Sequence, residues 1–364
     1  MTLPYVRLTG DAYEQGRQHG RLLTERIAHN LNLYFDRFER EALLPRQEVL
    51  RWAKLYGPAI ARQNGDYYAG MVGIAEGGGF DLTEIIALNV RYEILYYQSG
   101  VIAMGKDGCT AFAVSPAASA NGNLLIGQNW DWIPDVLGAV LETAHPAGHH
   151  TLAFTEAGIF GGKIGLNSAG LGLAINGLSA TNDDWTTLTK PYHLRCYEVL
   201  LQSDFEKAVA CITDTGRACS ANYLIAQTPD QVADIEAAPN TFHRLGWQAG
   251  CLVHANHFVD PAGIGISEPP DEFRPFSCKR QERLESLLAL SRPVTIETIK
   301  QHLSDHANAP RSICRHEVPT APIDEQYRTI TGIIIDLHTK TMHFSDGPPC
   351  QNQWQSLELS IHNL

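Results

Sequence analysis

Hydrophobic positions near the start of the chain recur at helical spacing. Over residues 22–38, apolar side chains follow one another at intervals of three and four. Asp11 and Glu14 precede this stretch with the spacing of a capping box, in which each residue satisfies a free backbone N–H of the first turn. Pro45 interrupts the pattern, and a second helix is expected over residues 46–63.

A similar pattern continues toward residue 100. Asp81 and Glu84 repeat the capping-box spacing ahead of an apolar stretch over residues 85–95. We therefore expect residues 1 to about 100 to be helical. A loop is expected over residues 100–108.

After residue 108 the pattern changes to short apolar runs that are typical of strands. Asn121-Gly122, a strong turn signal, separates residues 111–114 from residues 124–127 and predicts a pair of strands joined by a short connection. Further strands are expected at 152–154, 163–166, 170–176, 223–226, 232–236 and 252–254, helices at 192–202, 205–211, 275–290 and 296–304, and a closing hairpin at 330–337 and 341–344. The change of pattern divides the chain into a helical segment, 1–108, and a second segment, 109–364.

Composition and charge exclude several classes of partner. The 364 residues fit one large domain or two moderate ones, and 44% are hydrophobic, as in an ordinary globular core. A net charge of −12 argues against nucleic acid or an anionic membrane surface as partner. Neither a secretory signal nor an apolar run of about 20 residues is visible, so a cytoplasmic protein is expected. The sequence does not predict an oligomeric state.

The dipeptide Gly108-Cys109 stands where the helical pattern gives way to strands. A thiol at this place can attack the preceding carbonyl and convert the peptide bond to a thioester, whose hydrolysis leaves Cys109 as a new N-terminus. The α-amine of such a residue, with a pKa of about 7.7–8.0, can act as the base for its own thiol. A purely structural cysteine after a turn glycine is the alternative interpretation.

A carboxylate is expected beside this cysteine. Asp131 ends the second strand after Cys109, and the far end of that strand returns beside the start of the first. Asp131 can therefore hold the new α-ammonium group or orient the amine, although a polar turn residue would look the same. Asn176 and Asn256 each follow an apolar run, and an Asn amide is a good donor to an oxyanion; alone, each also fits a turn.

Arg315 can clamp a carboxylate or a phosphate, although a surface salt bridge is its common alternative role. Together with Trp130, the neighbour of Asp131, it is an expected substrate contact. No cofactor is expected, because Gly170-Leu171-Gly172 lacks the third glycine of a dinucleotide-binding turn and no Walker loop is present. No metal is expected either: the eight cysteines form no C-x-x-C pair, and His254 and His257 lack a third ligand at useful spacing.

Several stretches resemble the isopenicillin N acyltransferase family of N-terminal nucleophile hydrolases. They are spread over nearly the whole chain in one order. The stretches are Tyr13-Glu14-Gln15-Gly16-Arg17-Gln18-His19-Gly20, Gly73-Ile74-Ala75-Glu76-Gly77, Ala87-Leu88-Asn89-Val90-Arg91-Tyr92-Glu93-Ile94, Asp107-Gly108-Cys109-Thr110, Gly127-Gln128-Asn129-Trp130-Asp131, Lys163-Ile164-Gly165-Leu166-Asn167-Ser168-Ala169-Gly170-Leu171-Gly172 and Ser312-Ile313-Cys314-Arg315-His316.

The resemblance implies an α+β fold, a four-layer αββα sandwich, with autocatalytic cleavage before Cys109 and two fragments that stay associated. It implies Cys109 as nucleophile, Asp131 as partner of the amine and Asn256 as oxyanion or positioning residue. Asn176 is carried over from the more distant bile-salt hydrolase and penicillin V acylase relatives. Those relatives carry an Arg three residues before the Asp, where this chain has Gln128, so substrate recognition by that Arg is absent.

The sequence therefore predicts a self-processing cysteine amidase that cleaves a linear amide of a small molecule through an acyl-enzyme on Cys109. Acyl transfer from a CoA thioester to an amine, such as a β-lactam nucleus, is the alternative within this class. A non-catalytic, unprocessed binding protein with the same fold is an alternative of another class. A third is a thiol hydrolase without cleavage that uses His254 or His257 as its base.

Overall fold

Two β-sheets form the centre of the molecule. The computed structural model describes residues 3–98, 108–145, 148–214, 216–269 and 274–360, and most of the loop expected at 100–108 lies outside them. The larger sheet has the strand order β1 (Tyr5–Thr9), β4 (Gly138–Ala144), β5 (His150–Glu156), β6 (Ile164–Asn167), β7 (Leu171–Gly177), β8 (Ala221–Gln227), β9 (Gln231–Ala238) and β10 (Thr241–Leu245). The smaller sheet has the order β11 (Cys251–His254), β2 (Thr110–Val114), β3 (Leu125–Trp132), β12 (Arg328–Asp336), β13 (Thr341–Ser345) and β14 (Trp354–Glu358).

Helices cover the outer faces of both sheets. The α-helices are α1 (Ala12–Leu22), α2 (Thr24–Arg40), α3 (Arg46–Gln63), α4 (Gly65–Gly78), α5 (Leu82–Asn89), α6 (Arg91–Gln98), α7 (Tyr192–Leu200), α8 (Phe205–Thr213), α9 (Arg274–Leu290) and α10 (Ile296–Leu303), and two short 3-10 turns span Trp185–Thr187 and Ile323–Glu325. The two sheets face each other through β2 and β3 on one side and β7 and β8 on the other. Helices α7 and α8 pack on the larger sheet, and α9 and α10 on the smaller one. The expected four-layer αββα sandwich is thereby confirmed.

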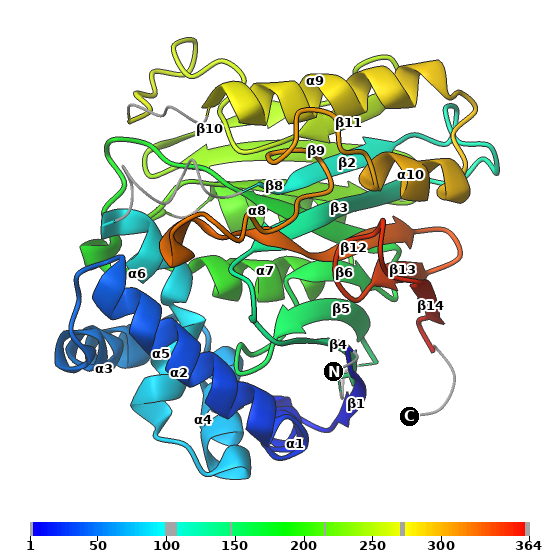
Figure 1. Ribbon diagram of the computed structural model, residues 1–364. Helices are drawn as coiled ribbons and strands as arrows, with labels where there is room; N and C mark the ends of the chain where they lie inside the picture. The colour runs from blue at the N-terminus through cyan, green and yellow to red at the C-terminus, as the bar shows by residue number, and fades with distance from the viewer. Residues whose placement is uncertain (1–2, 99–107, 146–147, 215, 270–273, 361–364) are drawn as a thin grey trace.

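The N-terminal helices gather below the sheets, at the lower left of Figure 1. The helix expected at 46–63 is α3, and the side chain of Asp11 caps α1 by accepting a hydrogen bond from the backbone N–H of Glu14. The expectation of an all-helical start is wrong in one respect, because β1 precedes these helices and pairs in parallel with β4. Residues 1–108 therefore contribute a strand to the larger sheet and share its hydrophobic core.

Exposed side chains explain why two strands were not expected from the sequence pattern. Strands β10 and β14 carry partly or fully exposed side chains along their length, so neither shows the apolar run that marked the buried strands. Strand β4 is buried at its start, but it had not been expected from the pattern either. The expected pair of strands after Cys109 is confirmed: β2 and β3 are antiparallel, with Thr110 opposite Asn129.

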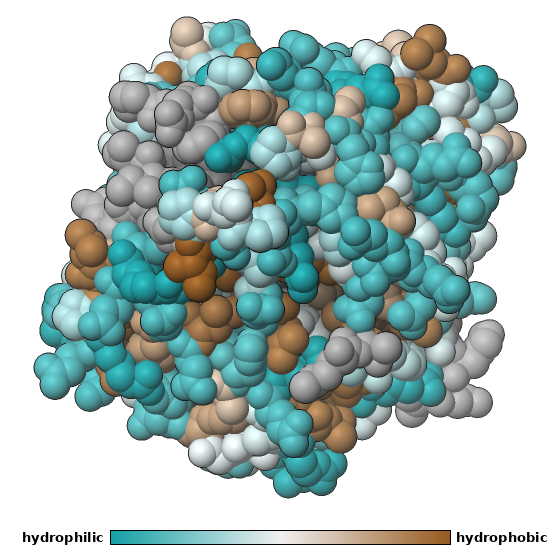
Figure 2. Space-filling model, viewed as in Figure 1, coloured by the Kyte–Doolittle hydropathy of each residue, from teal (hydrophilic) through white to brown (hydrophobic). Residues whose placement is uncertain are grey.

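The surface of the molecule is mostly polar on the face shown in Figure 2. Figure 2 shows a predominantly hydrophilic face with scattered hydrophobic patches. Leu43 and Leu290 are among the few large hydrophobic side chains of the described residues that are strongly exposed. Among those residues, none of the helices combines the length and the apolar character that a membrane span needs.

Helices α1 and α4 touch backbone to backbone. A Cβ atom added at Gly16 would overlap the carbonyl oxygen of Gly70, and one added at Gly73 would overlap that of Tyr13. Gly77 meets the carbonyl oxygen of Arg17 in the same way. The glycines in two of the stretches that carry the family resemblance are therefore explained by this close helix packing rather than by chemistry.

We expect Gly73→Ala to destabilise the protein by about 1–3 kcal/mol, because the added methyl group has no room against backbone atoms that cannot move away singly. Gly65→Ala, in the first turn of the same helix, is the matched control, since its Cβ meets nothing within 4 Å. That control should change stability by less than about 1 kcal/mol, in the stabilising direction. Urea unfolding of both variants measures the difference; equal effects would contradict the packing argument.

Glu93 is a buried carboxyl group between α6 and α7. It is 2% exposed, and its Oε1 atom accepts a hydrogen bond of 2.6 Å from the backbone N–H of Tyr192. Burial raises the pKa of Glu93 to about 7, although the N–H of Tyr192 and the charge of Arg91 act in the opposite direction. The folded state therefore holds the proton of Glu93 to a higher pH than the unfolded chain, where the ordinary value is 4.5.

Glu93 should make the protein less stable as pH rises from about 4.5 through about 7, because the unfolded chain ionises there first. The loss is at most roughly 3 kcal/mol, since each pKa unit corresponds to about 1.4 kcal/mol. In Glu93→Gln, which keeps an acceptor for Tyr192, the difference between the free energies of unfolding at pH 5 and pH 8 should shrink. Glu297→Gln, at a side chain that is 75% exposed, should leave that difference unchanged. An unaltered difference in Glu93→Gln would contradict the assignment.

Candidate active site

Cys109 stands directly before β2, a central strand of the smaller sheet. It is 2% exposed, and its thiol donates a hydrogen bond of 3.6 Å to the main-chain oxygen of Asp131. Side chains alternate between the two faces of a strand, and Ala111 and Ala113 belong with Cys109 to the core between the sheets. The thiol therefore points between the two sheets, while the side chain of Phe112 packs in a separate cluster with α9 and α10.

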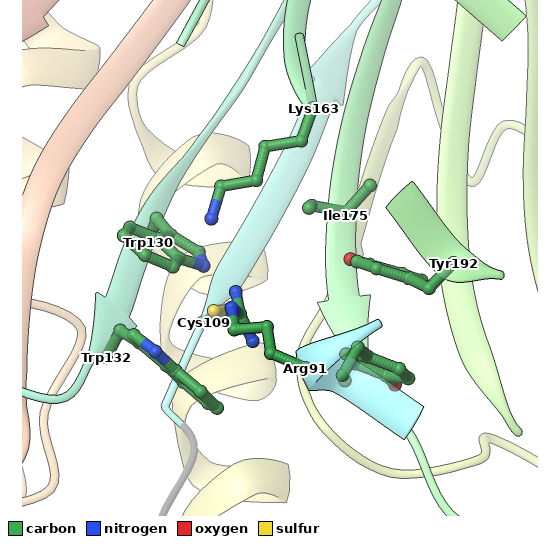
Figure 3. Close-up of a pocket in the computed structure, with 9 residues that line it drawn as sticks. Arg91, Cys109, Trp130, Trp132, Lys163, Ile175 and Tyr192 are labelled. Atoms are coloured by element: carbon green, nitrogen blue, oxygen red, sulfur yellow. The ribbon is translucent and has the colours of Figure 1, made fainter. Parts of the chain in front are cut away.

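The thiol opens into a pocket whose open space, counted together with the solvent at its mouth, is about 280 Å³ (Figure 3). Its walls come from both parts of the chain, with α6 on one side of Cys109 and strands β3 and β7 on the others. The lining residues are Arg91, Tyr92, Cys109, Trp130, Trp132, Lys163, Ile175, Gly177 and Tyr192. The space inside the pocket that a water molecule can occupy is about 20 Å³, room for little more than one water and far below an ordinary small-molecule site.

Two cations, Arg91 and Lys163, form the polar wall of the pocket, and both are paired with the carboxylate of Glu156. Glu156 accepts a hydrogen bond of 2.9 Å from Nε of Arg91 and a second one from Nη2 of the same guanidinium. It also accepts a hydrogen bond from Nζ of Lys163. All three side chains are at most 3% exposed. The hydroxyl of Tyr34 donates to the same carboxylate. Burial favours the neutral acid, but the two cations hold the pKa of Glu156 well below its usual range. With Lys163 protonated, the group carries two positive charges against one negative charge.

Aromatic rings surround these cations. Nζ of Lys163 lies 3.3 Å from the centre of the Trp130 ring, and the guanidinium of Arg91 lies 4.7 Å from that of Trp132. Figure 3 shows Lys163 directed toward Trp130 and Arg91 reaching toward Cys109. Burial lowers the pKa of Lys163 to about 7, with the charge of Arg91 adding to the effect and Glu156 opposing it. Below pH 7, where Lys163 is mostly charged, the pocket combines flat apolar surfaces with excess positive charge.

Asp131 and Arg315 lie against Gly108. A Cβ atom at Gly108 would be 2.6 Å from Oδ2 of Asp131 and 3.0 Å from Nη1 of Arg315, so a larger residue does not fit there. The hydroxyl of Thr329 donates a bond of 2.7 Å to Oδ1 of Asp131 and accepts one of 2.9 Å from the backbone N–H of Arg315. The structure therefore brings Gly108, Cys109, Asp131 and Arg315 together, while Arg315 is absent from the residues that line the pocket.

The two asparagines occupy different positions. Nδ2 of Asn256 donates a bond of 3.2 Å to the carbonyl of Gly177 at the pocket wall, and Oδ1 accepts one of 2.7 Å from Arg280. Nδ2 of Asn176 donates to the carbonyl of His254 at 3.4 Å, and its Oδ1 accepts from Asn222 at 3.2 Å. Asn256 thus reaches the pocket wall, whereas Asn176 belongs to a polar chain beside it.

Both histidines near the site are committed to other partners. The nitrogens of His254 face two acceptors, the carbonyl oxygen of Ala255 at 2.8 Å and Oε1 of Glu236 at 3.0 Å. Both nitrogens therefore act as donors, which describes the charged imidazolium ring. Burial alone would lower the pKa of His254, but Asp234 and Glu236 raise it to about 9. His257 is bonded to Ser277 through Nδ1 at 2.8 Å, and burial lowers its pKa to about 3.

Sequence reasoning missed the polar wall of the pocket. Arg91 and Lys163 lie in stretches that carried the family resemblance, yet neither was expected in the site. The sequence feature that could have indicated them is a positively charged residue beside apolar ones, because a charge that is buried there needs a buried partner of opposite charge. Gln128, at the position where more distant relatives carry Arg, accepts a bond of 2.6 Å from the backbone N–H of Ile175 and joins β3 to β7.

Solved structures of modest similarity were found. A mutant of conjugated bile acid hydrolase from Clostridium perfringens is 11% identical, with a TM-score of 0.49, and the alignment covers 70% of this chain and 93% of that one. Penicillin V acylase from Agrobacterium tumefaciens is 12% identical, with a TM-score of 0.47, over 69% of this chain and 86% of that one. With TM-scores this low, the fold rests on the sheets and helices described above.

Sequence comparison is more informative. The acyl-coenzyme A:6-aminopenicillanic-acid-acyltransferase 40 kDa form of Emericella nidulans is 27% identical over 317 residues, covering 85% of this chain and 84% of that protein. The model of the acyl-coenzyme A:6-aminopenicillanic acid acyl-transferase family matches residues 118–350, a range that contains Asp131, Lys163 and Asn256 and begins after Cys109. This range is well over half of the chain. The protein therefore belongs to the acyl-coenzyme A:6-aminopenicillanic acid acyl-transferase family.

Proposed function

We propose that this protein is a self-processing cysteine amidohydrolase that cleaves a linear amide of a small molecule through an acyl-enzyme on Cys109. The observation that carries the proposal is the position of Gly108-Cys109. The thiol opens into an aromatic pocket, and the carboxylate of Asp131 lies against Gly108. A bond held between a nucleophile and a buried carboxylate is suited to cleavage by its own side chain.

Self-processing begins with attack of the Cys109 thiol on the carbonyl carbon of Gly108. A new carbon–sulfur bond forms, the Gly108–Cys109 carbon–nitrogen bond breaks, and the nitrogen takes up a proton to become the α-amine of Cys109. Water then hydrolyses the thioester, which leaves a carboxylate on Gly108 and a free thiol on Cys109. The parts that result, 1–108 and 109–364, remain one body because β1 pairs with β4 and Arg91 pairs with Glu156.

Turnover uses the α-amine as its base. The amine takes the proton of the Cys109 thiol, and the thiolate attacks the carbonyl carbon of the substrate amide. Asn256, whose Nδ2 donates to the carbonyl of the pocket residue Gly177, offers its second amide N–H to the oxyanion, and Asp131 holds the α-ammonium in place. The departing amine takes that proton, and water hydrolyses the remaining thioester. The aromatic rings that line the pocket suit an acyl group with an apolar or aromatic surface.

A conventional Cys–His hydrolase is disfavoured by the histidines themselves. A general base needs a pKa near the working pH and a free lone pair. His254 offers neither, because both of its nitrogens donate to oxygen atoms and its pKa is raised to about 9. His257, with its pKa lowered to about 3, is too weak a base. The α-amine of a processed Cys109 needs no histidine.

Acyl transfer from an acyl-CoA thioester to an amine is the second candidate. The family match and the Emericella nidulans relative favour it. The pocket is compatible with it, since the excess positive charge of Arg91 and Lys163 suits an acceptor that carries a carboxylate. The two candidates share the acyl-enzyme on Cys109 and differ only in whether water or an amine resolves it.

Cys109→Ala should abolish both processing and activity. The unmodified protein should give two bands on a denaturing gel, of about 12 and about 28 kDa, in proportion to the residues before and after the bond out of 40.1 kDa. The variant should stay at full length, because no thiol attacks Gly108. Cys219→Ala, another buried cysteine, should be processed normally. An active preparation of the unmodified protein that shows a single full-length band would rule out self-processing.

The fate of the acyl-enzyme can be read from its products. The processed enzyme should hydrolyse N-acyl amines to free acid and amine, and adding a second amine should leave the yield of free acid nearly unchanged. Acyl thioesters with and without 6-aminopenicillanic acid form the comparison set, followed by mass spectrometry of the products. A predominant acylated amine would reject hydrolysis in favour of the acyltransferase candidate. Ligand binding without any turnover would reject both in favour of the binding protein.

A further inference from the structure

Four metal-binding side chains meet outside the pocket. His306 follows α10, Cys314 and His316 lie in the segment before β12, and Cys350 lies in the turn between β13 and β14. One ligand atom from each of the four lies within 4.8 Å of every other. Sequence spacing did not predict this group, because the ligands come from three separate segments and contain no C-x-x-C pair.

Four of the six distances within the group are close to the edges of a tetrahedron around zinc, and the other two, from His306 to the sulfur atoms, are within 4.8 Å. Sγ of Cys314 and Sγ of Cys350 are 3.6 Å apart, and the two histidine Nε2 atoms are 3.1 Å apart. Nε2 of His316 lies 3.2 Å from Sγ of Cys350 and 3.8 Å from Sγ of Cys314. Zinc–sulfur bonds of about 2.3 Å and zinc–nitrogen bonds of about 2.0–2.1 Å give tetrahedral edges of roughly 3.3–3.8 Å.

Neither a disulfide nor a set of separate hydrogen bonds accounts for this arrangement. A disulfide would bring the two sulfur atoms to about 2.05 Å, far closer than observed. A hydrogen bond between a thiol and an imidazole, or between two imidazoles, brings only two groups together. Here four groups lie within 4.8 Å of one another. Two sulfur and two imidazole ligands exclude Mg²⁺ and Ca²⁺, which prefer oxygen, and are the donor set of structural zinc sites.

We infer that His306, Cys314, His316 and Cys350 bind one Zn²⁺ ion in a closed, structural site. All four positions around the ion are supplied by protein, so the site leaves no open position for a substrate or a water. The ion joins three segments that lack regular secondary structure, one of them the turn before the edge strand β14. Its role is therefore to fix these segments relative to one another.

The segment it fixes carries Arg315. Cys314 and His316 flank this residue, whose backbone N–H donates to Thr329, which in turn donates to Asp131. The guanidinium of Arg315 reaches to within 3.0 Å of where a Cβ of Gly108 would stand. Zinc thus holds in place the positioning residues around the bond that we propose is cleaved. This consequence rests on the proposed function, whereas the binding of zinc does not.

Metal analysis of the full-length protein purified under reducing conditions tests the inference. We expect about one zinc per chain after incubation with ZnCl₂ and removal of excess metal. Cys350→Ser, at an exposed side chain whose replacement disturbs no core packing, should weaken zinc binding at least tenfold, and His306→Ala should do the same. Cys278→Ser, a partly exposed cysteine outside the group, should bind like the unmodified protein. Substitution with Co²⁺ should give the visible absorption of a tetrahedral thiolate site only where zinc binds.

Two further measurements separate the site from the catalytic proposal. Cys109→Ala should bind zinc normally, so failure of self-processing and failure of metal binding are distinguishable. Removal of zinc by a chelator should lower the Tm and speed amide hydrogen exchange in residues 312–316 of the unmodified protein, but change neither in Cys350→Ser. Absence of bound zinc under these conditions, zinc retained fully by Cys350→Ser, or a Cys314–Cys350 disulfide in freshly purified reduced protein would overturn the inference.

Discussion

The buried carboxylate of Glu156 is the contact on which the pocket depends. It neutralises Arg91, from the helical segment before Cys109, and Lys163, from the segment after it. Neither cation can be buried without that partner, because an unpaired charge in the interior costs several kcal/mol. The pocket wall therefore exists only while both parts of the chain are together. Cleavage at Cys109, as proposed, would leave these charges paired across the new break.

Contacts between residues far apart in the sequence, such as that of Glu156 with Arg91, are the part of the site that the sequence did not predict. Local signals were sufficient for α3 and for the pairing of β2 with β3, and the short connection after Asn121-Gly122 correctly returned Asp131 to the neighbourhood of Cys109. Glu156 is 65 residues from Arg91, and no local pattern joins them. The four ligands of the inferred zinc site are likewise brought together only by the closing of the smaller sheet.

The glycines in the stretches that carry the family resemblance have two different roles, helix packing and a place at the site. Gly16 and Gly73 lie in stretches that identify the family, but they serve the contact of α1 with α4. Gly108 lies in another such stretch and is also required by space, yet the atoms that crowd it are the carboxylate of Asp131 and the guanidinium of Arg315. The neighbours of each glycine, rather than its place in a motif, separate a packing role from a role at the site.

Cys109 and Gly108, directly before β2, face different surroundings. The thiol of Cys109 points between the sheets, toward Trp130 and Lys163, where a substrate is expected. Gly108 lies against Asp131 and Arg315, so an amine released at Cys109 would emerge between its own thiol and a buried carboxylate. That carboxylate is held by Thr329, and Thr329 is held by the backbone of Arg315 between two inferred zinc ligands. Cys109 meets the substrate on one side, and on the other side Asp131 must be held in a fixed position. The inferred metal would fix the segment around Arg315, which has no regular secondary structure.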